Sequence, residues 1–195
     1  MRYGTLTGMP RYPTRSWRAF DPARRVAPPA VRGVAPARNA RILGLDPGSR
    51  RTGFGVIECR GSQCVHVTHG CINVAELSVA ERLRTIFEAL QRLIGEHRPE
   101  EIAVERVFVS RNADSALKLG QARGAALCAV PAGLPVFEYA PRAIKLALVG
   151  SGAAEKPQVA HMIKILLRLD GRIAADASDA LAIAVCHAHS RLQPR

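Results

Sequence analysis

The chain has 195 residues, 48% of them hydrophobic, which is enough for one globular domain with a sizeable core and too few for two. Its 28 Lys and Arg against 16 Asp and Glu give a formal net charge of +12, which points to a polyanionic partner, most simply a nucleic acid. The sequence contains no uninterrupted apolar run long enough for a membrane-spanning helix.

Residues 1–40 form a basic, proline-rich segment without apolar periodicity. Their eight Arg and one Asp give +7, and they hold six of the 13 prolines. Such a segment buries too little surface to offset its ordering entropy, so we expect a disordered extension before a globular domain at 41–195. It could be a basic arm on phosphates, an Arg-rich targeting peptide or a dispensable extension, and the last interpretation is the simplest.

Apolar periodicity and turn residues predict an order of three strands followed by alternating helices and strands. Ser78 to Glu81 is a capping box that begins the first helix. Strands joined by short links favour an antiparallel meander, and strands separated by helices favour parallel pairing. The expected fold class is therefore α/β, a mixed five-stranded sheet with helices on both faces. The expected strands are 42–45, 54–58, 65–74, 101–105 and 134–139, and the expected helices are 83–94, 113–130, 142–149, one from Pro157 to a stop at 170–171, and 176–190.

Four carboxylates stand where they could meet. Asp46 and Glu105 each follow a short apolar strand, and the carboxyl ends of neighbouring parallel strands open onto one crevice. Asp176 and Asp179 lie three residues apart and share one helix face. An all-carboxylate set suits Mg²⁺ or Mn²⁺ rather than Zn²⁺, and two such ions ~3.5–4 Å apart can drive phosphodiester cleavage.

Each acid also has a structural interpretation. Asp46 before Pro-Gly could shape a turn, and Glu105 could be a surface acid at a strand end. Asp176 could be a helix N-cap, with Asp179 completing a capping box. Glu138 alternates with two aromatic residues and is a lesser candidate for the same crevice.

The cysteines and two histidines carry weaker signals. The five cysteines are odd in number and contain no C-x-x-C pair, so we expect neither a disulfide framework nor a zinc ribbon, and a reducing, cytoplasmic compartment. His187 and His189 do not face each other on a helix, so we expect them to stabilise its C-terminal end rather than share a metal.

At these residues the chain resembles RuvC, a family of Holliday-junction resolvases. The resemblance covers essentially all of 41–190. Five signatures carry it in order: ILGLDPGS at 42–49 with TGFGVI at 52–57, Glu105 and Val107-Phe108 with NADSALKLGQARG at 112–124, FEYAP at 137–141, GSGAAEK at 150–156 and DASDALAIA at 176–184. Residues 1–40 have no counterpart in the family pattern.

The resemblance implies a ribonuclease-H-like fold and a metal-dependent endonuclease that resolves Holliday junctions by paired symmetric nicks in recombination and repair. It implies Mg²⁺ as cofactor, with Mn²⁺ as a substitute and two ions per site on substrate. It also implies a homodimer that cooperates with the RuvA and RuvB branch-migration proteins. On this resemblance, Asp46, Glu105, Asp176 and Asp179 would be the catalytic metal ligands, and Phe108, Lys145 and Lys156 would contact DNA.

Two of these expectations have physical support in the residues. Phe108 lies between Arg106 and Arg111, and an exposed aromatic flanked by cations can stack on an unpaired base. We therefore count Arg111 as a DNA-binding candidate too. Small residues along 113–130 permit close approach of a second copy of the chain, although burial against the sheet explains them equally well.

Two other functions remain open from the sequence. Asp46, Gly48 and Gly53 also resemble the first phosphate loop of actin-like and sugar-kinase-like enzymes, but such folds need two lobes. A junction-binding protein without catalysis would use the four acids only as caps. Cleavage of a synthetic four-way junction with and without Mg²⁺ separates all three functions.

Overall fold

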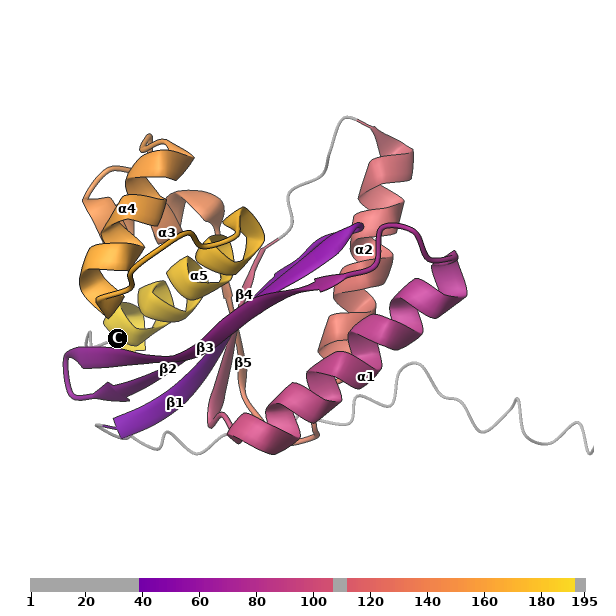
Figure 1. Cartoon of the computed structure of the whole chain (residues 1–195), viewed down its shortest axis with the longest axis horizontal. Coiled ribbons are helices and arrows are strands. Elements are labelled where there is room, and N and C mark those ends of the chain that lie inside the picture. The colour runs from indigo at the N-terminus through magenta and orange to yellow at the C-terminus, as the bar shows by residue number, and fades with distance from the viewer. Residues whose placement is uncertain (1–38, 107–111, 192–195) are drawn as a thin grey trace, which may run out of the picture. The chain divides into compact units, whose positions relative to one another are not determined.

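The computed structural model describes residues 39–106 and 112–191, which belong to one structural unit. Phe108 and Arg111 lie outside these residues, as do residues 1–38. All predicted elements occur, in the predicted order (Figure 1). They are β1 (Asn39–Pro47), β2 (Arg51–Arg60), β3 (Gln63–Asn73), α1 (Val79–His97), β4 (Glu101–Glu105), α2 (Ala113–Cys128), β5 (Val136–Tyr139), α3 (Pro141–Val149), α4 (Lys156–Leu167) and α5 (Ala175–Arg191).

The sheet is mixed, as predicted. Its strand order is β3-β2-β1-β4-β5. The first three strands pair antiparallel, whereas β4 runs parallel to both β1 and β5. The short links Gly48–Arg50 and Gly61–Ser62 permit only hairpins, and the helical crossovers bring β4 and β5 in parallel.

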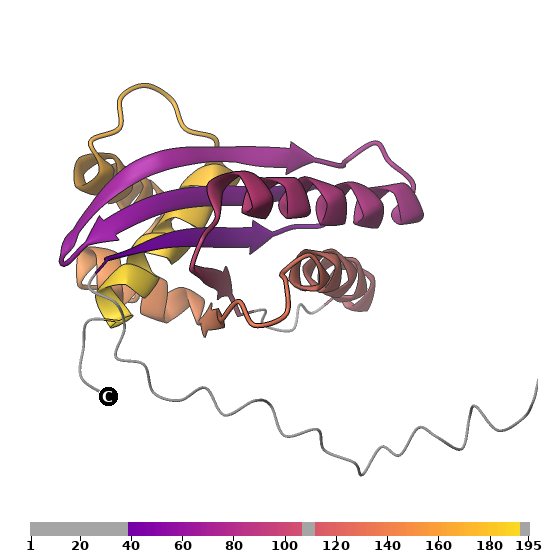
Figure 2. The same ribbon diagram turned by 90° about the horizontal axis from the view of Figure 1, so that it is seen from below.

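Helices cover both faces of the sheet. Figure 2 shows α1 and α2 on one side, with α3, α4 and α5 on the other. Each side has its own core: Ile86 and Leu90 of α1 pack with Leu43 and Leu45, while Ile163 and Leu181 pack with Ile42 on the opposite face. The alternation of Ile42, Leu43 and Leu45 between the two cores is expected of a central strand buried on both sides.

The local start signals of the helices are also confirmed. Glu81 Oε2 accepts a hydrogen bond from the backbone N–H of Ser78 at 3.1 Å, completing the capping box of α1. Pro157 lies in the first turn of α4, where its missing N–H costs nothing. None of the helices in the described ranges is both long and apolar enough to cross a membrane.

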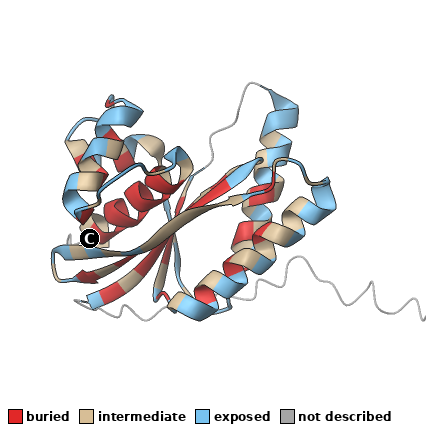
Figure 3. Ribbon diagram, viewed as in Figure 1, coloured by how far each residue is buried: buried red, intermediate tan, exposed pale blue. Residues whose placement is uncertain are grey.

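Helix α5 lies almost directly on the backbone of β1 and β2. A Cβ atom placed at Gly44 would stand 2.1 Å from the carbonyl oxygen of Ala180, and one placed at Gly55 would stand 2.6 Å from the Leu181 side chain. Only glycine permits so close an approach of a helix to a strand. The middle of α5 is correspondingly buried (Figure 3).

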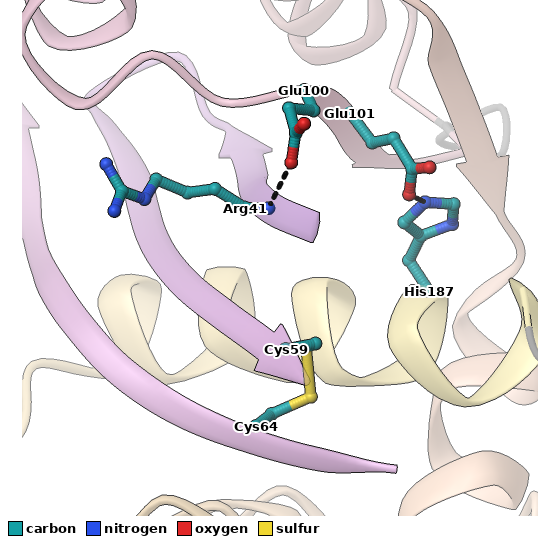
Figure 4. The surroundings of a disulfide bond; sticks show 6 residues. All are labelled: Arg41, Cys59, Cys64, Glu100, Glu101 and His187. Carbon is teal, nitrogen blue, oxygen red and sulfur yellow. Dashed lines mark hydrogen bonds and ion pairs between the residues drawn. A yellow bond between two sulfur atoms is a disulfide. The ribbon is translucent and has the colours of Figure 1, made fainter. Parts of the chain in front are cut away.

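One prediction about the cysteines is wrong. Cys59 and Cys64 form a disulfide between directly paired positions of the β2–β3 hairpin, with their Cα atoms 4.1 Å apart (Figure 4). Counting cysteines did not reveal it because the pairing arises from the hairpin register. Cys71, Cys128 and Cys186 are free.

The prediction for His187 is also wrong. Its imidazole is buried between the sheet and α5, where Nδ1 is 2.6 Å from the hydroxyl of Tyr139 and Nε2 is 2.7 Å from the carboxylate of Glu101. Arg191 donates to the other oxygen of Glu101 at 2.9 Å. His187 therefore belongs to a buried polar network rather than to the charge balance of a helix end.

Candidate metal centre

Asp46 and Glu105 lie side by side at one edge of the sheet. The parallel register pairs Leu45 of β1 with Val104 of β4, so the next residue on each strand is one of the two acids. This is the neighbourhood that the parallel pairing predicts. The negative charge of Glu105 contributes to raising the pKa of Asp46, as expected of carboxylates at short range.

The first turn of α5 brings the other two acids to the same edge. Gly53 is the register partner of Asp46 on β2, and a Cβ at Gly53 would stand 2.0 Å from the carbonyl oxygen of Asp176. Asp176 thus lies above the strand next to Asp46, and Asp179 follows one turn later on the same helix face. Because α5 begins at Ala175, Asp176 is inside the first turn and is not the N-cap.

Burial and mutual repulsion shift the two strand-end carboxyls. Burial is the main cause that raises the pKa of Asp46 to about 7, followed by the charges of Glu105 and Asp179. The pKa of Glu105 is also raised, again by burial first and then by Asp179. Both shifts mean that ionised oxygens at this edge lack enough positive charge around them.

Two lysines, one from α3 and one from α4, provide part of that charge. Lys156, in the first turn of α4, donates from Nζ to Asp179 Oδ2 at 2.7 Å, and this bond raises the pKa of the lysine. Lys145, half-buried on α3, lies near enough to lower the pKa of Glu105. The structure thus brings both predicted lysines to the four acids.

The donor set fits a hard divalent cation. Its members are four carboxylates from three elements, and Mg²⁺ prefers such oxygen ligands. Within residues 39–106 and 112–191, no three acidic, His or Cys side chains already stand at ligand distances from one common point. The acids lie within electrostatic range of one another, and Lys156 neutralises one of them.

The structure adds residues that the sequence did not single out. Arg51 of β2 approaches the carboxylate of Asp176 at 4.0 Å. The thiol of Cys71 is hydrogen-bonded to the backbone of Ala177; burial, and after it the charge of Asp176, raises the pKa of this thiol. No motif predicts either contact, because both depend on where α5 crosses the β2–β3 hairpin.

Glu138, the lesser candidate, does not join the acid cluster. It pairs with Arg123 of α2 and lies 3.8 Å from Nε of Arg106. Arg123 also donates to the backbone carbonyl of Glu105 at 2.5 Å. The only sequence signal for this arginine is its place in the motif at 112–124.

Comparison with known proteins agrees with this geometry. Residues 42–187 match the family model described as crossover junction endodeoxyribonuclease RuvC. The chain is 60% identical over 150 residues to the crossover junction endodeoxyribonuclease RuvC of Alkalilimnicola ehrlichii, covering 76% of this chain and 91% of that one. It is 59% identical over 152 residues to that of Methylococcus capsulatus, covering 77% and 92%.

A solved structure shows the same fold. The Thermus thermophilus RuvC in complex with a Holliday junction substrate superposes with a TM-score of 0.74 at 34% identity, covering 78% of this chain and 95% of that one. The architecture is accordingly ribonuclease-H-like. Sheet order, acid cluster, family model and structural match agree, and the chain belongs to the RuvC family of crossover junction endodeoxyribonucleases.

Proposed function

We propose that Asp46, Glu105, Asp176 and Asp179 bind Mg²⁺, with Mn²⁺ as a substitute, and that two ions act once the DNA is in place. The observation that carries this proposal is the meeting of these four carboxylates at one end of the sheet, where partial burial and the charges of the three neighbouring acids raise the pKa of Asp46 to about 7. A bound divalent cation would offset that repulsion. This site serves the activity of the RuvC family, which is the resolution of Holliday junctions by paired symmetric nicks during recombination and DNA repair.

When bound, the ions would supply an activated water and stabilisation of the departing oxygen. The water oxygen forms a bond to phosphorus as the bond from phosphorus to the 3′ oxygen breaks, which leaves a 5′-phosphate and a 3′-hydroxyl. The protein's own contribution is placement. The β1–β4 register brings the strand ends that carry Asp46 and Glu105 side by side, and the packing of α5 against Gly53 places Asp176 and Asp179.

Lys145 and Lys156 serve the substrate in this proposal. Both stand at the rim of the acid cluster, and Lys156 is highly exposed beyond its contact with Asp179. A phosphate entering the crevice would meet their ammonium groups before it met the carboxylates. Phe108 and Arg111 would engage bases at the junction centre, and the connection between β4 and α2 in which they lie starts directly at Glu105.

The decisive experiment is cleavage of a synthetic four-way junction with and without Mg²⁺, comparing wild type with Asp46→Asn. We expect paired nicks at symmetric positions for the wild type, and retained binding without cutting for the variant. Glu96→Gln is the matched control, since it also replaces a carboxylate with an amide, but at an exposed position at the far end of α1. Binding without nicking by the wild type would support a purely structural junction binder, and ATP hydrolysis without DNA would support the kinase-like alternative.

We also propose that the protein acts as a homodimer and works with RuvA and RuvB. Two identical active sites related by a two-fold axis suit a two-fold symmetric junction. The free face of α2 supports this surface as the contact: Leu117 is 62% exposed, and nothing lies within 4 Å of a Cβ placed at Gly120 or Gly124. Sedimentation of wild type and Leu117→Glu tests it, and a wild type that sediments as a monomer at all concentrations would contradict the dimer.

The N-terminal boundary is a further part of the proposal. The sequence predicted the nuclease domain at 41–195; we propose that it starts two residues earlier, with β1 at Asn39, and that the residues before it are a dispensable extension, because the family match starts at residue 42. A chain starting at Asn39, where β1 begins, should cut a junction as fast as the full chain. A rise in the dissociation constant at low salt would instead identify a basic DNA-binding arm, and import into an organelle of the full chain alone would identify a targeting peptide.

We place the protein in the cytoplasm, where bacterial DNA and the expected partners are. Cell fractionation tests this. The same cells, lysed in the presence of an alkylating agent, show whether Cys59 and Cys64 are bonded there, because cytoplasmic thiols are normally kept reduced.

A further inference from the structure

Arg123 connects α2 to β4 and β5 at the end of the sheet where the four acids lie. Its side chain is only 12% exposed, and its two Nη groups have different acceptors. Nη1 donates to the backbone carbonyl of Glu105, at the end of β4, and Nη2 donates to the carboxylate of Glu138 on β5. A planar guanidinium can hold two acceptors in fixed directions, which a lysine cannot.

The partner of Arg123 is itself fixed. Glu138 is opposite Val104 in the parallel register of β4 and β5, and its second oxygen faces Nε of Arg106 at 3.8 Å. The backbone N–H of Arg106 donates to the carbonyl of Tyr139 at 2.7 Å. The ends of β4 and β5 are thus joined through backbone and side chains immediately beside Glu105.

The position of this connection matters because Glu105 is the last residue of β4. Beyond it the ladder to β1 has ended, since the last β1–β4 register pair is Leu45 and Val104. Glu105 still pairs with Tyr139 of β5 but no longer with β1, so the hydrogen bond from Arg123 to its carbonyl group supports its backbone on the side that β1 has left. Functional groups held through such supporting contacts are positioned to within about 0.5 Å, and loss of the support is a common cause of a poorly formed site.

We propose that Arg123 is a positioning residue for the metal centre: its bonds to the Glu105 carbonyl and to Glu138 hold the Glu105 carboxylate at the place where it ligates the cation. This inference rests on the proposed role of Glu105 as a ligand. Arg123 itself faces the backbone of Glu105 and the carboxylate of Glu138, so it acts through Glu105 rather than on the DNA.

The test is single-turnover junction cleavage at increasing Mg²⁺ concentration. For Arg123→Ala we expect the Mg²⁺ concentration at half-maximal rate to rise at least fivefold and the maximal rate to fall at least tenfold. Junction binding without divalent ions should stay within twofold of wild type. Arg123→Lys keeps the charge but loses the two-acceptor geometry, so its Mg²⁺ midpoint should lie between those of wild type and Arg123→Ala.

A matched control separates this role from loss of charge. Arg60→Ala also removes one arginine paired with a glutamate, Glu58 at 3.1 Å, but at the opposite end of the sheet. Its Mg²⁺ midpoint should equal that of wild type. Glu138→Gln, which keeps an acceptor and removes one charge, should shift the midpoint less than Arg123→Ala and serves as the mild variant if Arg123→Ala does not fold.

The outcomes distinguish the inference from the proposed function. If Glu105→Gln cuts as fast as wild type, Glu105 is no ligand and the proposed metal site fails. If Glu105→Gln is inactive while Arg123→Ala and Arg123→Lys keep the wild-type midpoint, the inference alone is overturned. A lower maximal rate with an unshifted midpoint also overturns it, because a smaller folded fraction lowers the rate without changing the metal dependence.

Discussion

The carbonyl oxygen of Asp176 occupies the space that a side chain at Gly53 would need. A Cβ atom there would stand 2.0 Å from that oxygen. Gly53 is at the same time the register partner of Asp46. One glycine therefore sets the spacing between the helix that carries Asp176 and the strand that carries Asp46.

Substituting this glycine should damage the site more than the fold. For Gly53→Ala we expect a destabilisation of roughly 1–3 kcal/mol from overpacking. The loss in cleavage rate, expressed as a rise in activation free energy, should be larger than this loss of stability. The reason is that α5 must shift away from β2 and carries Asp176 and Asp179 with it. Chemical denaturation and single-turnover cleavage measure the two effects.

Gly95→Ala is the matched control for that experiment. Gly95 lies in α1, and nothing is within 4 Å of a Cβ placed there. Alanine in a helix interior should stabilise the protein by roughly 0.5–1 kcal/mol and leave cleavage unchanged. A Gly53→Ala variant that cleaves at the wild-type rate would show that the active site does not need the close packing of α5 against Gly53.

The raised pKa of Asp46 makes stability depend on pH in the metal-free protein. The folded pKa, about 7, is above the ordinary value of 3.8, so the folded state holds a proton that the unfolded chain releases. The protonated Asp46 carboxyl therefore stabilises the folded state. This contribution to the free energy of unfolding is fully present below about pH 4 and is lost as pH rises through 7. Asp46→Asn cannot ionise, so in EDTA its melting temperature should exceed that of wild type more at pH 8 than at pH 5.

That comparison has a clear opposite outcome. A melting-temperature difference that is the same at pH 5 and pH 8 would mean that Asp46 titrates normally and is not crowded by its neighbours. Adding Mg²⁺ at pH 8 should raise the melting temperature of wild type and not that of Asp46→Asn, since a ligand that binds only the folded state stabilises it.

In the proposed metal site, Lys156 would compete with the cation for Asp179. Its ammonium group is 2.7 Å from Asp179 Oδ2, and its charge lowers the pKa of both Asp46 and Glu105. Without this cation the acid cluster is more negative, so Lys156→Gln should bind Mg²⁺ more tightly. The maximal cleavage rate should nevertheless fall, because the phosphate loses a cation.

Measuring both quantities in one Mg²⁺ titration checks this prediction. The expected result is a lower Mg²⁺ midpoint together with a lower maximal rate. Lys118→Gln is the control, because Lys118 forms an exposed pair with Asp114 on α2, away from the cluster. A raised midpoint in Lys156→Gln would mean that the lysine supports the metal site instead of competing with the ion.

The buried network around His187 should matter for stability alone. Replacing His187 with Leu leaves the Tyr139 hydroxyl without this partner and leaves Glu101 with one hydrogen-bond partner fewer, Arg191 remaining. We expect a loss of roughly 2–4 kcal/mol, the cost of breaking buried polar contacts. At a temperature where the variant is fully folded, its cleavage rate should match that of wild type, and a rate reduced tenfold would contradict this.

The sequence by itself determined the element order, the mixed sheet and the neighbourhood of Asp46 and Glu105. These follow from local causes, because apolar periodicity fixes each element and connection length fixes whether neighbouring strands run parallel or antiparallel. The resemblance to the family added the candidate roles of the four acids and the two lysines.

Only the tertiary structure decided how α5 sits on Gly53, that Lys156 pairs with Asp179, and that Arg123 holds the end of β4. It also decided the disulfide between Cys59 and Cys64 and the burial of His187, both against expectation. The physical reason is common to all of them. These contacts join different elements, so they depend on strand register and helix packing, which residue spacing within one segment does not encode.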